Sequence, residues 1–194
     1  VLDAVTNSVI RACEGEVLEL ALNGNLDIAA ETYFNVIDAK TAALISVCCR
    51  VGALAGRAPS PIIDALASFG THLGRAFQIM DDLMDLVADS PRWGKPLGAD
   101  LREGRVTLPM IHTLRCANPT DSARLRALLR TPEITPRHVR EAVEINHRYG
   151  GLEAARHEAL KQACVAKAAL SVLAPSPAVE ALHAIADYAV VRDQ

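Results

Sequence analysis

The sequence is poor in aromatic residues and has no long hydrophobic run. Aromatic side chains make up 4% of its 194 residues, whereas hydrophobic residues make up 51%, mostly alanine and leucine. No apolar stretch reaches the ~18 residues of a transmembrane segment, and no signal peptide is visible. Strand-like alternation is lacking too. The composition therefore favours helix packed on helix, and we expect an all-α, cytoplasmic protein.

The chain also lacks an excess of positive charge. Its net charge is −3 at pH 7, and this argues against a nucleic-acid partner, which would require a basic face. Lysine is scarce, with four lysines against sixteen arginines. In this background, a lysine at a chemically demanding position is less easily explained by chance.

Cysteine spacing gives no sign of a disulfide or metal site. The five cysteines are odd in number and form no CxxC pair. We expect them to be buried, reduced thiols. They are Cys13, Cys48, Cys49, Cys116 and Cys164.

Helical periodicity runs through almost the whole sequence, as one domain over residues 1–194. Thr135-Pro136 and Ser176-Pro177 are typical helix starts, and Gly150-Gly151 separates two helices. The segment 89–106 is expected to be a non-helical loop, either functional or a disordered connector. The expected helices are 3–23, 31–55, 61–88, 107–117, 121–130, 136–149, 151–173 and 177–192.

The segment 77–87 carries the main chemical signal. Asp81 and Asp85 are four residues apart, and Asp82 and Asp85 three apart, so a helix places all three carboxylates on one face. Gln78 lies one turn earlier on that face. The remaining positions are apolar, and they predict a helix that is buried on most sides.

These carboxylates favour a metal site. Like charges at such spacings oppose a helix by roughly 0.2–0.5 kcal/mol per pair, and the nearest basic residue, Arg75, is more than a turn away from Asp81. Hard oxygen ligands suit Mg2+, which also keeps waters and bridges to substrate phosphates. A diphosphate is therefore the natural third partner. The alternative is a solvated acidic stripe.

Several segments match one family in order and in spacing. FQIMDDLMDL and the following WGKPLGADLREGRVTLP resemble the second aspartate-rich motif and loop of trans-isoprenyl (polyprenyl) diphosphate synthases. VIDAKTAALISVCCRVGALAG resembles their Lys-Thr helix, and ALHAIADYAVVRDQ resembles their C-terminal helix. CEGEVLELALNGNLDIAAETY resembles the form found in long-chain bacterial members. The whole chain thus resembles the C-terminal part of such a synthase.

The resemblance implies an isoprenoid-synthase-type helical bundle that forms a homodimer. It implies the head-to-tail addition of isopentenyl diphosphate to an allylic diphosphate, through ionisation, condensation and proton loss. In this reaction Asp81, Asp82 and Asp85 would hold Mg2+ against the allylic diphosphate.

The resemblance also assigns residues outside the acidic face. Lys40 and Lys95 would be point charges on the diphosphate, and Arg105 stands where the family usually has lysine. Thr41 and Gln78 would turn oxygen dipoles toward the developing allylic cation. For Lys40, the alternative is a lysine that extends its stem along a partly buried helix.

One feature of the family is missing from these residues. A second DDxxD does not occur, although the family has an earlier aspartate-rich helix with basic residues for isopentenyl diphosphate. We therefore expect a bundle whose N-terminal helices are absent, and a chain that cannot turn over alone.

Three other interpretations stay open. The chain could be a non-catalytic or split subunit that needs a partner carrying the other motif. It could be a relative of terpene cyclases, although the DLREGRVTLP loop resembles the synthases. Two Glu-x-x-His pairs, Glu144 with His147 and Glu180 with His183, also allow a di-iron carboxylate bundle.

Overall fold

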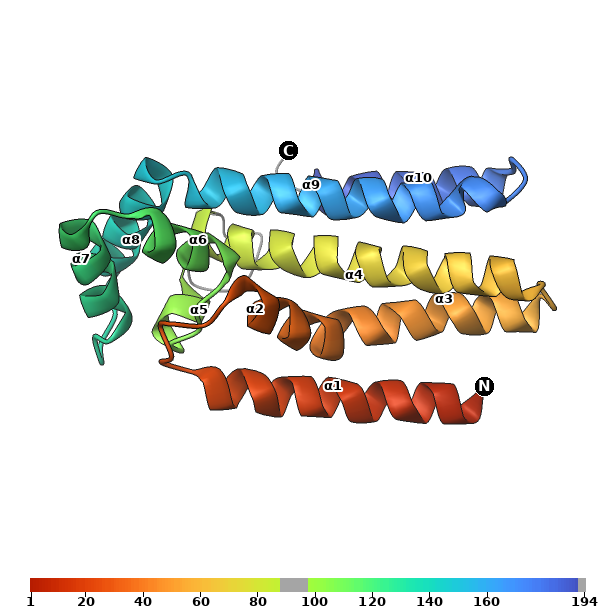
Figure 1. Cartoon of the computed structure of the whole chain (residues 1–194), viewed down its shortest axis with the longest axis horizontal. Helices are drawn as coiled ribbons and strands as arrows, with labels where there is room; N and C mark the ends of the chain where they lie inside the picture. Colours follow the sequence, from red (N-terminus) through yellow and green to blue (C-terminus); the bar gives the residue numbers. More distant parts are fainter. Residues whose placement is uncertain (88–97, 192–194) are drawn as a thin grey trace. The chain divides into compact units, whose positions relative to one another are not determined.

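The computed structural model describes residues 1–87 and 98–191. All regular structure within these ranges is helical and none is strand, so the all-α prediction is confirmed (Figure 1). The elements are α1 (Leu2–Leu22), α2 (Ala30–Ile37), η1 (Asp38–Ala42), α3 (Ala43–Ala55), α4 (Ser60–Val87), α5 (Ala99–Arg102), α6 (Leu108–Cys116), α7 (Pro119–Leu129), α8 (Pro136–Arg148), α9 (Gly151–Ala169), η3 (Leu170–Val172) and α10 (Pro177–Val190).

Helix starts follow the expected chemistry. The helices α8 and α10 begin with a proline, and the preceding residue, Thr135 or Ser176, accepts a hydrogen bond from the backbone N–H three residues later. These two predicted caps are confirmed. Asn118 caps α7 in the same way, over 2.8 Å to the Asp121 amide. Proline at the first position costs nothing, because the N–H it lacks has no partner within the helix.

The chain divides into two compact units. The first comprises Val1–Leu18, Phe34–Gln78 and Glu158 onward, and the second comprises Glu19–Tyr33 and Ile79–His157. The helix α4 is continuous and contributes residues to both. The single domain expected over residues 1–194 stays a prediction.

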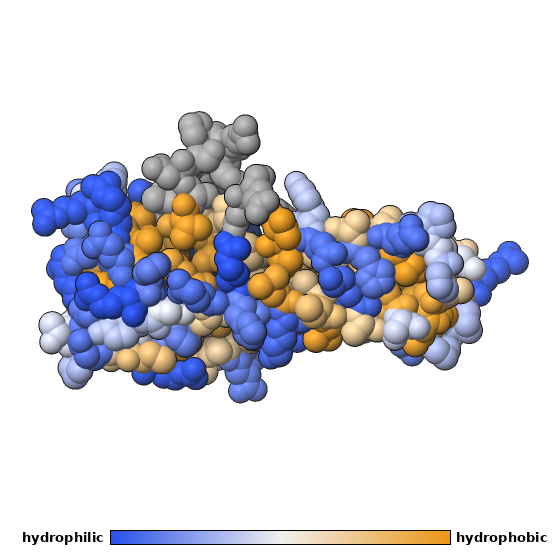
Figure 2. Space-filling view, turned by 90° about the horizontal axis from the view of Figure 1, so that it is seen from above, coloured by the Kyte–Doolittle hydropathy of each residue, from blue (hydrophilic) through white to orange (hydrophobic). Residues whose placement is uncertain are grey.

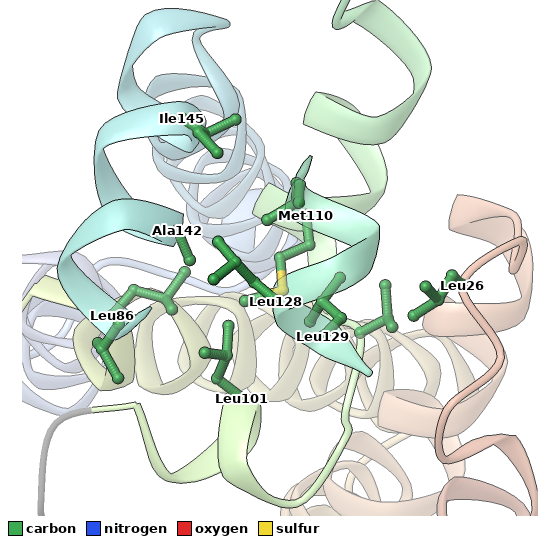
Figure 3. Close-up of a cluster of buried hydrophobic side chains, with 11 residues drawn as sticks. Leu26, Leu86, Leu101, Met110, Leu128, Leu129, Ala142 and Ile145 are labelled. Atoms are coloured by element: carbon green, nitrogen blue, oxygen red, sulfur yellow. The ribbon is translucent and has the colours of Figure 1, made fainter. Parts of the chain in front are cut away.

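Each unit has an apolar core. In the first, Phe69 and Leu73 of α4 pack with the buried residues Ala166, Leu170 and Ala186 near the end of the chain. In the second, Leu26, which lies between α1 and α2, meets side chains of the segment from α4 to α8, and Figure 3 shows this cluster. The labelled members are Leu26, Leu86, Leu101, Met110, Leu128, Leu129, Ala142 and Ile145.

The expectations for the 89–106 segment and for cysteine burial are wrong. The short helix α5 occupies part of the 89–106 segment that we expected to be free of helix. The cysteines are free thiols as expected, but only Cys49 is partly buried, and the others are exposed. An isolated apolar residue at helical spacing does not show whether another element covers it, and this is why the burial prediction failed.

The surface is mixed. Figure 2 shows hydrophobic residues reaching the surface between hydrophilic ones on one face. Of the described helices, none combines the length and the apolar content needed to cross a membrane. The helix α1 exposes large apolar side chains, among them Leu2 at 78% and Leu20 at 67%.

Candidate functional site

The Lys-Thr segment forms a π-helical turn. We expected one continuous helix over 31–55, but Asp38–Ala42 adopts the wider π conformation between α2 and α3. Lys40 and Thr41 both lie on this turn. A π turn is rare and costly, and it is found frequently at functional sites.

Two glycines allow other helices to approach the backbone of η1 closely. A Cβ on Gly15 of α1 would stand 2.5 Å from the Lys40 nitrogen, and a Cβ on Gly74 of α4 would stand 2.6 Å from the Ala42 Cα. Both distances are too short for a real side chain. The turn that carries Lys40 and Thr41 is therefore wedged between backbone surfaces within the first unit.

An ion pair fixes the start of η1. The Arg75 guanidinium of α4 donates from Nε and from Nη2 to the two oxygens of Asp38, each over 2.6 Å. It also lies 5.6 Å from the centre of the Phe34 ring. Hydrogen bonding to Asp38 raises the pKa of Arg75. A bidentate pair of this kind specifies orientation as well as charge.

Three predicted site residues are held within the first unit. The Lys40 side chain is 19% exposed, and its ammonium lies 3.4 Å from a Glu16 carboxylate oxygen. The Thr41 hydroxyl donates to the Gln78 side-chain oxygen over 2.7 Å. The structure thus brings together Thr41 and Gln78, to which the same role had been assigned.

The acidic face of α4 lies in the second unit, and α4 is buried on most sides there. Ile79 and Met80 are fully buried, Leu83 is almost so, and Asp82 is only 7% exposed. This confirms the expected burial and excludes a fully solvated stripe, because a carboxylate this buried is costly without polar partners.

Uncharged donors hold two of the aspartates. Asp82 accepts a hydrogen bond from the Tyr33 hydroxyl over 2.6 Å. Asp85 accepts bonds from the backbone amides of Ala99 and Asp100, each over 3.0 Å. These bonds orient the carboxylates and bring no positive charge of their own.

Several negative charges act on Asp100, whose amide contacts Asp85. Burial, followed by the charge of Asp85, raises the pKa of Asp100 to about 6, against the opposing effect of Arg105. Glu19 and Asp81 raise the same pKa further. An added cation would relieve this repulsion.

Arg105 lies among carboxylates. Its guanidinium is 3.1 Å from Asp100 and 3.6 Å from Glu19, and it also bonds Glu103. Its predicted contact with a diphosphate stays a prediction. Of the other predicted residues, Lys95 lies outside the described residues.

The aspartates alone do not form a closed metal cage. Within residues 1–87 and 98–191, no group of three or more His, Cys, Asp or Glu side chains is arranged to hold a metal ion. Mg2+ nevertheless binds through one or two carboxylates, with waters and substrate phosphates completing its octahedron. The hard oxygens of Asp81, Asp82 and Asp85 on a buried helix fit this open kind of site.

Comparison with known proteins decides the family. The sequence profile described as polyprenyl synthetase matches residues 1–146. The chain belongs to this family. It is 40% identical over 192 residues to a short chain isoprenyl diphosphate synthase of Methanothermobacter thermautotrophicus, covering 99% of this chain and 58% of the relative. It is 39% identical over 196 residues to the octaprenyl diphosphate synthase of Escherichia coli, covering 100% and 60%.

The fold agrees with the sequence. A solved polyprenyl synthase from Caulobacter crescentus, complexed with calcium and isoprenyl diphosphate, superposes with a TM-score of 0.93 at 32% identity. The match covers 100% of this chain and 59% of that structure. This polyprenyl synthetase chain therefore spans about three fifths of the length of such relatives.

The di-iron interpretation finds no support in this polyprenyl synthetase chain. The His147 side chain is 74% exposed and lies 3.7 Å from Glu153. Glu144 and Glu180 are exposed as well. A di-iron site requires ligands that project into the interior of a bundle, and these side chains face solvent.

Sequence reasoning missed the residues that support the site. Tyr33, Asp100 and Glu19 each contact a predicted site residue, and Asp38 pairs with Arg75 at the start of the turn that carries Lys40. Arg75 was noted only as too distant to neutralise Asp81, and its actual partner is Asp38. Only the closeness of Asp38 to Lys40 along the chain could have drawn attention to one of them.

Proposed function

We propose that this chain supplies the second aspartate-rich half of a prenyl diphosphate synthase, which joins isopentenyl diphosphate to an allylic diphosphate. One observation carries the proposal: Asp81, Asp82 and Asp85 lie on an apolar helix in which Asp82 is 7% exposed. The Caulobacter relative, solved with calcium and isoprenyl diphosphate, supports a divalent cation and a prenyl diphosphate as ligands.

Asp81, Asp82 and Asp85 would hold Mg2+ in this proposal. When bound, the ion would neutralise charge on the diphosphate leaving group. The hydrogen bonds from Tyr33 and from the Ala99 and Asp100 amides keep Asp82 and Asp85 oriented. An ionised carboxylate has roughly four acceptor positions, so accepting one or two such bonds is compatible with metal ligation.

Lys40 and Arg105 would bind the diphosphate. The Lys40 ammonium has three donors, so it can bond a phosphate oxygen while it keeps its contact with Glu16. Positive groups held where negative charge develops lower the barrier to ionisation of the C–O bond. Lys95, outside the described residues, is assigned the same role by the family resemblance alone.

Thr41 and Gln78 would stabilise the developing cation. Because the Thr41 hydroxyl donates its proton to Gln78, the lone pairs of the Thr41 oxygen can face positive charge. The fixed turn η1 holds that oxygen in one place before the reaction begins.

The test measures binding of farnesyl diphosphate to the full chain by calorimetry, with and without Mg2+. We expect Asp81→Ala with Asp82→Ala to weaken Mg2+-dependent binding at least about tenfold, or ~1.4 kcal/mol. Asp64→Ala is the matched control, since Asp64 lies on the same helix and is 68% exposed. Equal Mg2+-dependent affinity in the double variant and the control would refute the metal assignment.

A split or non-catalytic subunit is the second candidate. The exposed apolar residues of α1 favour it, because a large apolar surface invites association. We expect no prenyl transfer by this chain alone and transfer once a chain with the other aspartate motif is added. Mg2+-dependent product formed by the purified chain without another subunit would contradict this expectation.

A further inference from the structure

A buried tyrosine reaches the acidic face of α4 from a distant part of the chain. Tyr33 lies on α2, is 5% exposed and donates its hydroxyl proton to Oδ2 of Asp82 over 2.6 Å. The two residues are 49 positions apart in the sequence, and both belong to the second unit. Tyr33 has none of the catalytic or binding roles proposed above.

Asp82 needs a donor because of where it lies. Ile79 and Leu86, three and four positions away on the same helix, are buried apolar side chains. In such surroundings an isolated carboxylate takes up a proton or turns toward water. A hydroxyl that donates to an ionised carboxylate over 2.5–2.7 Å makes one of the stronger hydrogen bonds in proteins, and it favours the charged form.

The donor to Asp82 is a phenol, which differs in charge from the donors to another aspartate of the same unit. Asp121, elsewhere in the second unit, accepts bonds from Tyr149 and from the Arg148 guanidinium, each over 2.8 Å. A guanidinium neutralises its carboxylate and competes with any other cation, whereas a phenol adds no positive charge. The Tyr33 hydroxyl is a donor of this uncharged kind, and it contacts Asp82 over 2.6 Å.

We propose that Tyr33 is a positioning residue, which fixes the Asp82 carboxylate in the orientation that binds a divalent cation and leaves its charge intact. This inference rests on the proposed function. The buried ring has only two rotatable bonds, so its hydroxyl defines a direction at little cost in entropy. Tyr33 acts through Asp82 and has no direct role in the chemistry.

The test is Tyr33→Phe in the full chain, with Mn2+ as the probe and free Mn2+ measured by electron paramagnetic resonance. Losing a residue that orients a metal ligand typically weakens affinity 10–100-fold, and we expect a loss in that range. Tyr149→Phe is the matched control, because it removes the same kind of bond from Asp121 in the same unit. Its Mn2+ affinity should stay within about twofold of the unaltered chain.

Asp82→Ala separates the possible failures. If Asp82→Ala loses Mn2+ affinity while Tyr33→Phe keeps it, the inference is wrong and the metal assignment stands. If Asp82→Ala binds Mn2+ like the unaltered chain, Asp82 is not a metal ligand, and the inference fails with that assignment. A purely structural Tyr33 would lower Tm equally with and without Mn2+, whereas a positioning residue would also reduce the Mn2+-induced rise in Tm.

A measurement on the unaltered chain covers the case in which Tyr33→Phe does not fold. The chain has three tyrosines, so ring carbon-13 labelling gives few signals to assign. Mn2+ bound at Asp82 lies close to the Tyr33 ring, and its unpaired electrons should broaden the Tyr33 signals before those of Tyr149. A Tyr33 signal that stays sharp at saturating Mn2+ would overturn the proposal.

Discussion

The two units hold their predicted site residues by different means. In the first, Lys40 and Thr41 sit on a π-helical turn that is wedged by close backbone approach at Gly15 and Gly74. In the second, carboxylates are held by hydrogen bonds from neutral donors, such as that from Tyr33 to Asp82. In the first unit, close packing fixes the backbone that carries the site residues. In the second, uncharged donors orient a carboxylate without adding positive charge. The comparison can be tested by removing each kind of contact in turn.

The largest effect is expected for Gly15→Ala. The new Cβ would stand 2.5 Å from the Lys40 nitrogen, and overpacking of this kind costs about 1–3 kcal/mol. Because backbone atoms cannot move aside as a side chain can, we expect a loss of about 2–3 kcal/mol in the free energy of unfolding, measured in urea. Gly52→Ala is the control, since Gly52 of α3 has no atom within 4 Å of the added Cβ.

Alanine at position 52 should stabilise the chain by up to about 1 kcal/mol, because alanine favours a helix over glycine. If Gly15→Ala and Gly52→Ala change stability alike, the backbone of η1 is not wedged against α1.

Arg75→Met should have the next largest effect. It keeps most of the side-chain volume but leaves the half-buried Asp38 without its two donors. Leaving such a group unsatisfied costs about 2 kcal/mol, again measured by unfolding in urea. Arg124→Met is the control. It removes a bidentate pair with Glu141 in which the arginine is 51% exposed, and we expect a clearly smaller loss of stability because water screens exposed ion pairs. Equal losses would show that burial adds nothing to the Asp38 pair.

The smallest effect concerns pH, in protein free of divalent cations. The pKa of Asp100 is about 6 in the folded chain and about 3.9 when unfolded, so the folded state binds the proton more tightly. Binding of this proton stabilises the folded chain below about pH 4, and the stabilisation is lost as pH rises through 6. Asp100→Asn should therefore be more stable than the unaltered chain at pH 8, by about 1–2 kcal/mol after allowing for partial exposure, and equal to it at pH 4.

Asp121→Asn should behave in the opposite way. Hydrogen bonds from Tyr149 and then Arg148 lower the pKa of Asp121. The stability that they give is present above the unfolded pKa and is lost as pH falls through the folded one. The asparagine variant should therefore be the less stable protein at pH 8, and the difference should shrink in acid. Both variants losing stability at pH 8 would contradict the raised pKa of Asp100.

Local sequence signals predicted most of the fold. The expected helix over 61–88 is Ser60–Val87 in the structure, and the caps at Thr135 and Ser176 are present. Helical periodicity and capping depend on residues a few positions apart, so a sequence records them directly. The family resemblance gave Thr41 and Gln78 the same role but did not predict that they bond each other, which the structure shows.

The supporting contacts could not be read in the same way. The bond between Tyr33 and Asp82 depends on how two helices pack, and no spacing in the sequence encodes it. The exposure of Cys48 depends on whether another element covers α3. The π turn escaped notice because the residues of 31–55 remain good helix formers on both sides of it.

The π turn also sets how α2 is rotated about the helix axis relative to α3. A π turn holds one residue more than an α turn, and one residue corresponds to about 100° of rotation about the helix axis. Deleting Ala39 would let α2 and α3 merge into one regular helix. It would also rotate the end of α2, with the buried Val36 and Ile37, away from the side that faces the core. The extra residue thus rotates α2 relative to α3 by a fixed angle. With this rotation, the apolar faces of both helices point toward the core, although their spacing in the sequence does not fit one regular helix.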